Sequence, residues 1–254
     1  MAERKKNIPK KRRKKRRIKK GVFFFVFTLF VVLVSLSLTV FFPIGKIQVE
    51  GKSIYIETEI VHATDIKEGD NLFMPLFNGS RGKAKAALPY LQSVSYRFVL
   101  PDTIVISVKP YIAAYQFKVN EEYVVVAKDG TALEILSVRR EGVPVILVNG
   151  LEYQIREKVK IADTGRAESL AVIQSATEEI KESVDTIDLS DALNIKMQIA
   201  QTEVILGSNV YLEKKMQMVK KMLSQVPEGE KGTINMSAWT PENKQGSYIK
   251  ITEE

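Results

Sequence analysis

An uninterrupted run of 21 uncharged residues, Val22–Phe42, constrains this chain more than any other feature of its sequence. A helix rises about 1.5 Å per residue, so this run would form a helix of roughly 31 Å, close to the thickness of the hydrocarbon core of a bilayer. We therefore predict a single transmembrane helix at residues 21–42.

The tail before this run predicts how the chain is oriented. Residues 1–20 contain 13 Lys or Arg side chains and one acid, Glu3. Positive residues stay on the cytoplasmic side of a membrane, so the N-terminus is expected inside and the rest of the chain outside. A cleavable signal peptide is the alternative, but its apolar region has about 7–15 residues and ends in small residues. The run here is longer and lacks a small pair at its end, which favours an uncleaved, single-pass type II anchor.

The charge of the chain is concentrated in that tail. The remaining 234 residues carry 25 basic and 29 acidic side chains, as expected of an ordinary globular surface. A basic tail also occurs in nucleic-acid-binding proteins, but beside a membrane segment it is better explained by topology and by contact with anionic lipid. The chain contains no cysteine, so its exported part must fold by burying apolar surface rather than through disulfides.

Residues 43–110 show a pattern typical of a compact α+β domain. Two helices packed on one face of a three-stranded sheet would suit this order of elements. The expected elements are a strand ending at Gly51, a helix over Glu57–Thr64, a helix from Ser80 as N-cap to Pro89, and strands over Val94–Val99 and Thr103–Val108.

Residues 111–240 are predicted to form a β-rich domain with two helices, followed by a C-terminal edge strand and tail at 241–254. The apolar spacing predicts an amphipathic helix from Asp163 to about Glu182 and a second helix capped by Ser208 and ending near Gln225. The expected strands are Tyr123–Ala127, Thr131–Ile135, Pro144–Val148, Thr186–Leu189, Ile195–Ala200, Glu203–Leu206, Thr233–Met236 and Tyr248–Ile251.

The chain offers little for catalysis. Its one histidine, His62, lies in a predicted helix, and neither a Cys nucleophile nor a phosphate-binding glycine loop is present. One His without Cys also argues against a zinc site. Lys214-Lys215 and Lys220-Lys221 are expected on the outer face of the last helix, and Trp239 is expected to cover the core. We predict no catalytic, cofactor-binding or metal-binding residues, and therefore a binding protein.

Several short stretches resemble the FtsQ/DivIB family of bacterial cell-division proteins. They begin with the opening strand Ile44–Gly51, followed by the turn Glu68–Phe73. The other matching stretches are Leu88–Val94, Leu100–Ile104, the hairpin Lys128-Asp129-Gly130, and Leu206-Gly207 followed by Lys214 or Lys215. No single stretch is very specific for the family. Their order and spacing behind one N-terminal anchor are specific.

The resemblance implies a POTRA domain at residues 43–110 and the family's β domain after it. It implies a non-enzymatic protein of the cell membrane at the division septum. The implied partners are two small single-span proteins, FtsL and DivIC (also called FtsB), together with the machinery of septal peptidoglycan synthesis that their complex regulates. No nucleic acid is expected to bind.

We predict partner binding at the last strands of the β domain. The open edge of a sheet is a template for an added strand, and the family resemblance points to the same end. The predicted contact residues are Thr233, Ile234, Asn235, Met236, Tyr248, Ile249, Lys250 and Ile251. An anchored cell-wall enzyme with an unusual site is one alternative. The other is a POTRA-type chaperone or scaffold for exported envelope proteins, although such proteins usually carry several POTRA units and a barrel.

Overall fold

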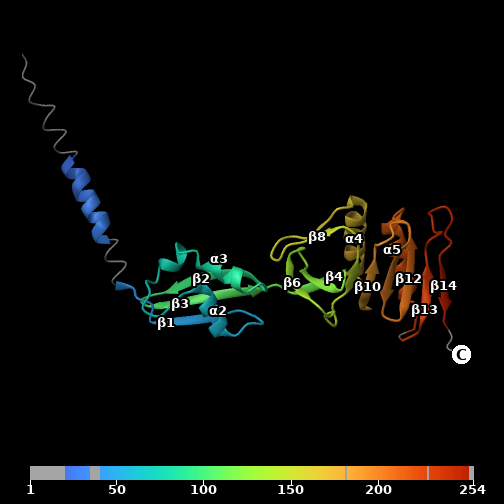
Figure 1. Cartoon of the computed structure of the whole chain (residues 1–254), viewed down its shortest axis with the longest axis horizontal. Coiled ribbons are helices and arrows are strands. Elements are labelled where there is room, and N and C mark those ends of the chain that lie inside the picture. The colour runs from blue at the N-terminus through green and yellow to red at the C-terminus, as the bar shows by residue number, and fades with distance from the viewer. Residues whose placement is uncertain (1–20, 35–40, 181, 228, 252–254) are drawn as a thin grey trace, which may run out of the picture. The chain divides into compact units, whose positions relative to one another are not determined.

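The computed structural model describes residues 21–34, 41–180, 182–227 and 229–251. The chain divides into two compact units, Met1–Pro110 and Tyr111–Glu254, and Figure 1 shows the elements of each. The predicted basic tail lies outside the described residues, as do the last three residues of the chain.

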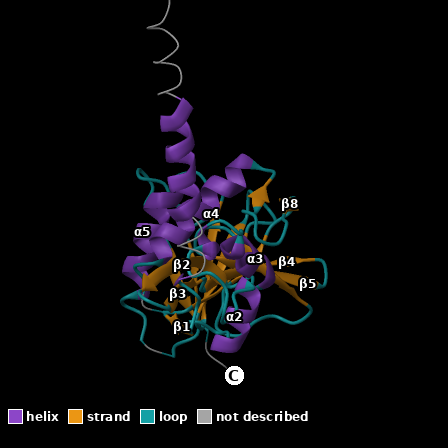
Figure 2. Ribbon diagram, turned by 90° about the vertical axis from the view of Figure 1, so that its left-hand side faces the viewer, coloured by secondary structure: helices purple, strands orange, loops and turns teal. Residues whose placement is uncertain are grey.

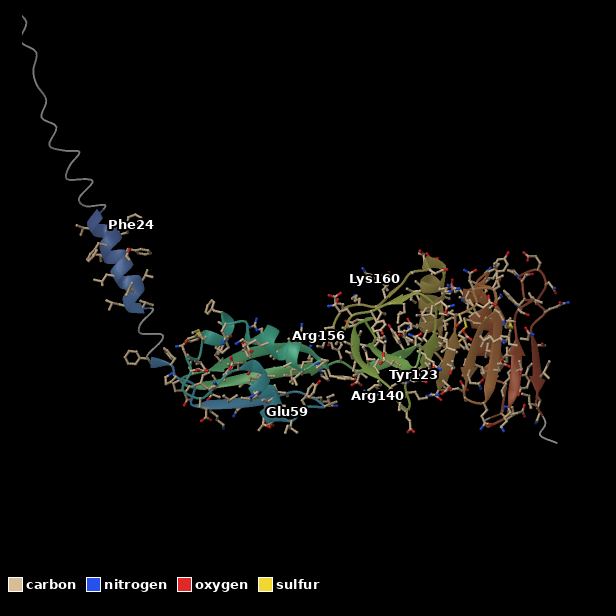
Figure 3. The ribbon with its side chains drawn as sticks, in the orientation of Figure 1. Phe24, Glu59, Tyr123, Arg140, Arg156 and Lys160 are labelled. Carbon is tan, nitrogen blue, oxygen red and sulfur yellow. The ribbon has the colours of Figure 1, made fainter. Side chains whose placement is uncertain are left out.

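Residues 21–34 form a helix, and the side chain of Phe24 projects from it (Figure 3). The predicted membrane segment continues through residues 35–40, which lie outside the described part. Among the helices that are described, none combines the length and the apolar character needed to cross a membrane.

The first unit contains the predicted order of elements, with an additional 3-10 helix, η1. Its three strands form one sheet in the order β1-β3-β2, with β1 parallel and β2 antiparallel to β3. The elements are β1 (Lys46–Glu50), α2 (Glu57–Thr64), η1 (Met74–Leu76), α3 (Ser80–Ala87), β2 (Leu91–Val99) and β3 (Thr103–Pro110).

The helices α2 and α3 pack on the same face of this sheet. Ile60 of α2 and Ala84 of α3 share a buried cluster with alternate residues of β3, which are Ile104, Ile106 and Val108. Alternate side chains of a strand point to opposite faces, so this cluster identifies the helix-covered face. At the start of α2, the Glu59 carboxylate (Figure 3) accepts a hydrogen bond of 3.1 Å from the Ile56 amide, since no Ser or Thr provides the cap.

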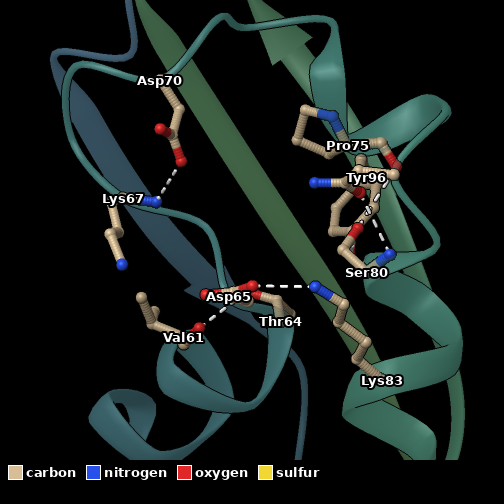
Figure 4. A network of polar contacts seen from close by, with 10 residues as sticks. Val61, Thr64, Asp65, Lys67, Asp70, Pro75, Ser80, Lys83 and Tyr96 are labelled. Carbon is tan, nitrogen blue, oxygen red and sulfur yellow. Dashed lines mark hydrogen bonds and ion pairs between the residues drawn. The ribbon is translucent and has the colours of Figure 1, made fainter.

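The predicted N-cap of the second helix is wrong by one residue. Gly79 precedes α3, and Ser80 is the first helical residue. The Ser80 hydroxyl lies 2.7 Å from the Tyr96 hydroxyl and donates to the Pro75 carbonyl at 3.2 Å (Figure 4). It therefore links η1, α3 and β2 instead of capping its own helix, a long-range role that local sequence does not reveal.

The second unit is built on a nine-stranded sheet in the order β14-β13-β12-β11-β10-β7-β4-β5-β6, with a separate two-stranded pair, β8 and β9. Its helices are α4 (Thr164–Thr177) and α5 (Leu212–Leu223). The strands are β4 (Ala113–Val119), β5 (Glu122–Ala127), β6 (Ala132–Leu136), β7 (Val145–Leu147), β8 (Leu151–Glu152), β9 (Lys160–Ile161), β10 (Val184–Asp188), β11 (Ile195–Ile199), β12 (Thr202–Gly207), β13 (Gly232–Asn235) and β14 (Ser247–Lys250).

One row of apolar side chains crosses this sheet from strand to strand. The register pairs place on one face Val124, Phe117, Ile146, Ile187, Met197, Val204, Ile234 and Tyr248. Ile173 of α4 and Met216 of α5 are fully buried against the same cluster. The helices therefore cover this face; both are labelled in Figure 2.

Both helices of this unit are shorter in the structure than the sequence predicted. Asp163 is the N-cap of α4, as its carboxylate accepts from the Arg166 amide at 2.9 Å, but the helix ends at Thr177 rather than Glu182. The second helix begins at Leu212, preceded by Tyr211 in a left-handed conformation with φ of 57°. Ser208 is thus not its cap, because the chain first makes a turn after β12.

The opposite face of the sheet is covered only in part. Gln116 of β4 is fully buried on it, where its amide donates to the carbonyls of Arg140 and Val143, both at 2.8 Å, and accepts from the Arg140 amide at 2.9 Å. These bonds hold the segment 140–143 (Arg140 is labelled in Figure 3) over β4. From β10 to β14 the side chains of this face are partly or fully exposed.

Candidate partner-binding edge

The last strand of the chain forms one edge of the nine-stranded sheet. β14 pairs with β13 alone, in an antiparallel register that sets Ile249 opposite Thr233 and Tyr248 opposite Ile234. The pairing continues at Ile251, whose amide donates to the Lys231 carbonyl at 3.0 Å. Figure 1 shows β14 as the outermost arrow at the red end of the sheet.

The backbone of β14 presents hydrogen-bonding groups away from the sheet. Because the Ile251 amide points toward β13 and strand residues alternate, Ile249 also faces β13, whereas Tyr248 and Lys250 direct their N–H and C=O groups outward. Among the described residues, no strand pairs with this outer side. The edge can therefore accept one more strand.

The two faces of this edge differ in chemistry. Ile249 and Ile251 lie on the face that the helices leave open and are 60% and 51% exposed. Thr233, Asn235 and Ile205 lie beside them on the same face and are partly exposed. An incoming strand would thus find apolar side chains next to the free backbone groups.

A small polar cluster fixes β14 on the helix-covered face. The Tyr248 hydroxyl donates to Glu230 at 2.7 Å, and the Lys250 ammonium contacts the other oxygen of the same carboxylate, also at 2.7 Å. Lys250 and then Tyr248 hold the pKa of Glu230 below its usual range, while Glu230 raises the pKa of Tyr248. The Tyr248 ring lies against Gly232, where any side chain would collide with it.

Two of the predicted contact residues lie in the core and not on the exposed edge. Ile234 and Met236 are fully buried in the core cluster. In this structure they pack β13 and the residue after it against the helices, so we assign them to the core rather than to the exposed edge. Trp239 is also buried and joins this core, in agreement with its predicted covering role.

The prediction for Lys215 is wrong. It was expected on the outer face of the last helix, but it is buried. Its side chain is only 1% exposed, and its ammonium donates to the carbonyls of Leu206 at 2.7 Å and Ser208 at 3.0 Å. Burial lowers the pKa of Lys215. The two bonds hold the turn between β12 and α5, where Gly207 has φ of 69° and a Cβ would lie 2.9 Å from the Ser237 Cα.

Sequence reasoning missed Glu230 and Gly232 as residues that position the edge, and Lys215 as the residue that holds the turn after β12. Glu230 and Gly232 can be connected with Tyr248 only when the register of β13 and β14 is known. The sequence pattern alone does not indicate that they meet. The described residues contain no group of three or more His, Cys, Asp or Glu side chains suited to a metal ion. His62 lies exposed on α2, in the other unit.

Comparisons with known proteins agree with the resemblance. Residues 42–111 match the family described as "POTRA domain, FtsQ-type". A relative from Clostridium acetobutylicum called Cell division protein DivIB is 30% identical over 214 residues, covering 81% of this chain and 84% of the relative. Proteins of the same name from Clostridium botulinum (strain Hall) and Clostridium tetani are 28% and 20% identical, covering 89% and 82% of this chain and 90% and 82% of their own lengths.

Proposed function

Because the chain belongs to the DivIB family of cell-division proteins, we propose that it is a non-enzymatic, single-span membrane protein whose exported units bind other division proteins at the septum. The segment Val22–Phe42 would cross the membrane with the basic tail in the cytoplasm. The residues after it would then face the cell exterior, where the division machinery builds the septal wall.

We propose FtsL and DivIC (FtsB) as the partners, and through them a regulatory role in septal peptidoglycan synthesis. The observation that supports this proposal is the free edge of β14, with outward backbone groups at Tyr248 and Lys250 and exposed apolar side chains at Ile249 and Ile251. In strand addition, main-chain hydrogen bonds supply affinity, and alternate side chains supply specificity. Thr233 and Asn235 extend the same face inward from the edge.

The Lys250→Pro variant tests this mode of binding. Proline removes one outward N–H donor and places its ring on the free side, yet leaves the bonds between β13 and β14 in place. We expect the full-length variant to bind DivIC and FtsL roughly tenfold more weakly, as the loss of one interfacial hydrogen bond and the steric block imply. Affinity is measured by titration in detergent with the full-length partners.

Lys250→Ala is the matched control, because it removes the ion pair with Glu230 but keeps the backbone N–H. It should bind nearly as well as the parent protein, since exposed ion pairs contribute little. Equal binding by Lys250→Pro and the parent would move the site away from this edge. Absence of binding by the parent protein itself would refute the proposed partners.

A further inference from the structure

Exposed apolar side chains gather at one end of the first unit. Phe77 is 83% exposed and Leu100 is 61% exposed, values that are high for such residues on a globular domain. We call the apolar tip the five residues Met74, Leu76, Phe77, Val99 and Leu100, all of them exposed. Clustered apolar exposure of this kind marks an interaction surface, whereas single exposed residues do not.

The tip is assembled from two separate connections of the chain. Met74, Leu76 and Phe77 belong to η1 and the residue after it, whereas Val99 and Leu100 end β2 and begin the turn to β3. The rings of Phe73 and Phe98, which directly precede these two groups, lie 5.5 Å apart. The fold therefore brings both groups to the same end of the sheet.

The end of the uncharged run contacts the two residues that directly precede Met74 of this tip. Phe42 is the last residue of that run, and its ring lies 5.6 Å from the Phe73 ring in an edge-to-face contact. Its carbonyl also accepts a hydrogen bond of 2.8 Å from the Leu72 amide. If Val22–Phe42 crosses the membrane, Phe42 lies at the outer surface of the bilayer, and these contacts hold the apolar tip at the same depth.

We propose that the apolar tip inserts into the interfacial layer of the outer leaflet and seats the first unit on the membrane. The occupant of this surface is lipid, which is the phase that continues from Phe42. Phe and Leu side chains favour this layer when they lie on one side of a segment next to the bilayer. The inference rests on the proposed membrane anchoring and adds a second, non-covalent attachment that would fix the orientation of the first unit.

Charge does not explain the attachment. At the same end Lys46 is exposed, but Asp70 and Asp102 lie beside it, since the Asp70 carbonyl accepts from the Ile44 amide and the Asp102 carbonyl from the Gly45 amide. Lys46 thus has two acidic residues close to it at this end of the sheet. We expect apolar insertion to hold the unit, and therefore little effect of salt or of anionic lipid content.

A single-cysteine label reads out the insertion, because the chain has no cysteine of its own. Phe77→Cys carries the environment-sensitive dye NBD in the full-length protein, reconstituted into vesicles of phosphatidylcholine and phosphatidylglycerol. Ile54→Cys is the matched control, as Ile54 is also apolar and 63% exposed. It precedes Tyr55, whose hydroxyl accepts from the Tyr90 amide next to the start of β2, at the opposite end of the sheet. The eight residues of β3 separate the two ends by roughly 25 Å.

The expected result is a blue-shifted emission at position 77 and quenching there by lipids that carry a nitroxide near the headgroup, with neither effect at position 54. Both effects should persist in high salt and in pure phosphatidylcholine. Equal emission and quenching at the two positions would overturn the inference, as would a shift at position 77 that grows with protein density, which would indicate a second copy of the chain as the occupant.

Flotation of the same vesicles separates this inference from the function on which it rests. Labelled protein that fails to float with vesicles and is extracted by alkaline carbonate would refute the membrane anchor and the inference together. Protein that floats and resists extraction, but shows no difference between positions 77 and 54, would refute only the docking of the tip.

Discussion

Replacing Gly232 with alanine is expected to loosen the docking of β14 on the sheet while the sequence of the strand stays intact. A Cβ at this position would lie within about 2.6 Å of the Tyr248 ring, which must then leave its place against β13. Gly232 is not among the residues with positive φ, so the expected effect comes from the collision with the end of the Tyr248 side chain. Overpacking of this kind costs about 1–3 kcal/mol, which corresponds to roughly 5- to 150-fold weaker binding of a partner that requires the docked strand.

This prediction is checked by partner titration together with hydrogen exchange of residues 247–251. Faster exchange in that segment with unchanged exchange in β11 and β12 would show that the edge alone has loosened. Gly82→Ala is the control, since a Cβ there meets no atom within 4 Å and alanine favours the helix. Partner affinity that survives a demonstrably detached β14 would contradict the strand-addition model.

The second large effect is expected from Lys215→Met. Methionine matches the length of the lysine stem but cannot donate to the carbonyls of Leu206 and Ser208, which then lose their partner inside the protein. Leaving buried polar groups unsatisfied costs about 1–3 kcal/mol, so we expect the melting temperature of the second unit to fall by on the order of 5 °C. Scanning calorimetry of the full-length protein measures this change.

The pH dependence of the same variant has a defined sign. Burial lowers the pKa of Lys215 below its ordinary value of 10.5. Between the lowered and the ordinary pKa, the unfolded chain binds more protons than the folded one, so the stability that depends on Lys215 increases as pH rises through that window. The advantage of the parent protein over Lys215→Met should therefore grow as pH rises toward 10.5.

Lys214→Met is the internal control for both measurements, because Lys214 is the exposed neighbour in the same helix. It should change neither the melting temperature nor its pH dependence by much. A similar loss in both variants would mean that helix charge, rather than the two buried hydrogen bonds, accounts for the effect.

The spacing of apolar residues and the position of turn residues predicted most elements of the first unit. The alternation of Ile104, Ile106 and Val108 marks the face that packs under the helices, and Glu57–Thr64 is a helix with the predicted bounds. The cap at Ser80 failed, since its hydroxyl bonds to Tyr96, which is 16 residues away. Local patterns report burial on one face well, but they carry no information about partners that are distant in the chain.

The sequence analysis did not predict β4, a central strand of the second unit. Ala113–Val119 contains Gln116 and Lys118 within its run and lacks a clear alternation, yet it lies between β7 and β5. Gln116 is acceptable there because three hydrogen bonds to Arg140 and Val143 satisfy its amide. A polar residue at a buried position is explained only by the segment that folds over it.

By itself, the sequence determined that this chain carries an uncharged run beside a basic tail, lacks the residues of common catalytic sites, and matches one family in the order of its motifs. Only the tertiary structure decided that β14 ends the sheet, that Lys215 is buried, and that Phe42 contacts Phe73, beside the apolar tip. The physical reason is the distance along the chain over which each kind of interaction acts. Periodicity and charge act over neighbouring residues, whereas edges, buried hydrogen bonds and clustered surfaces arise where distant segments meet.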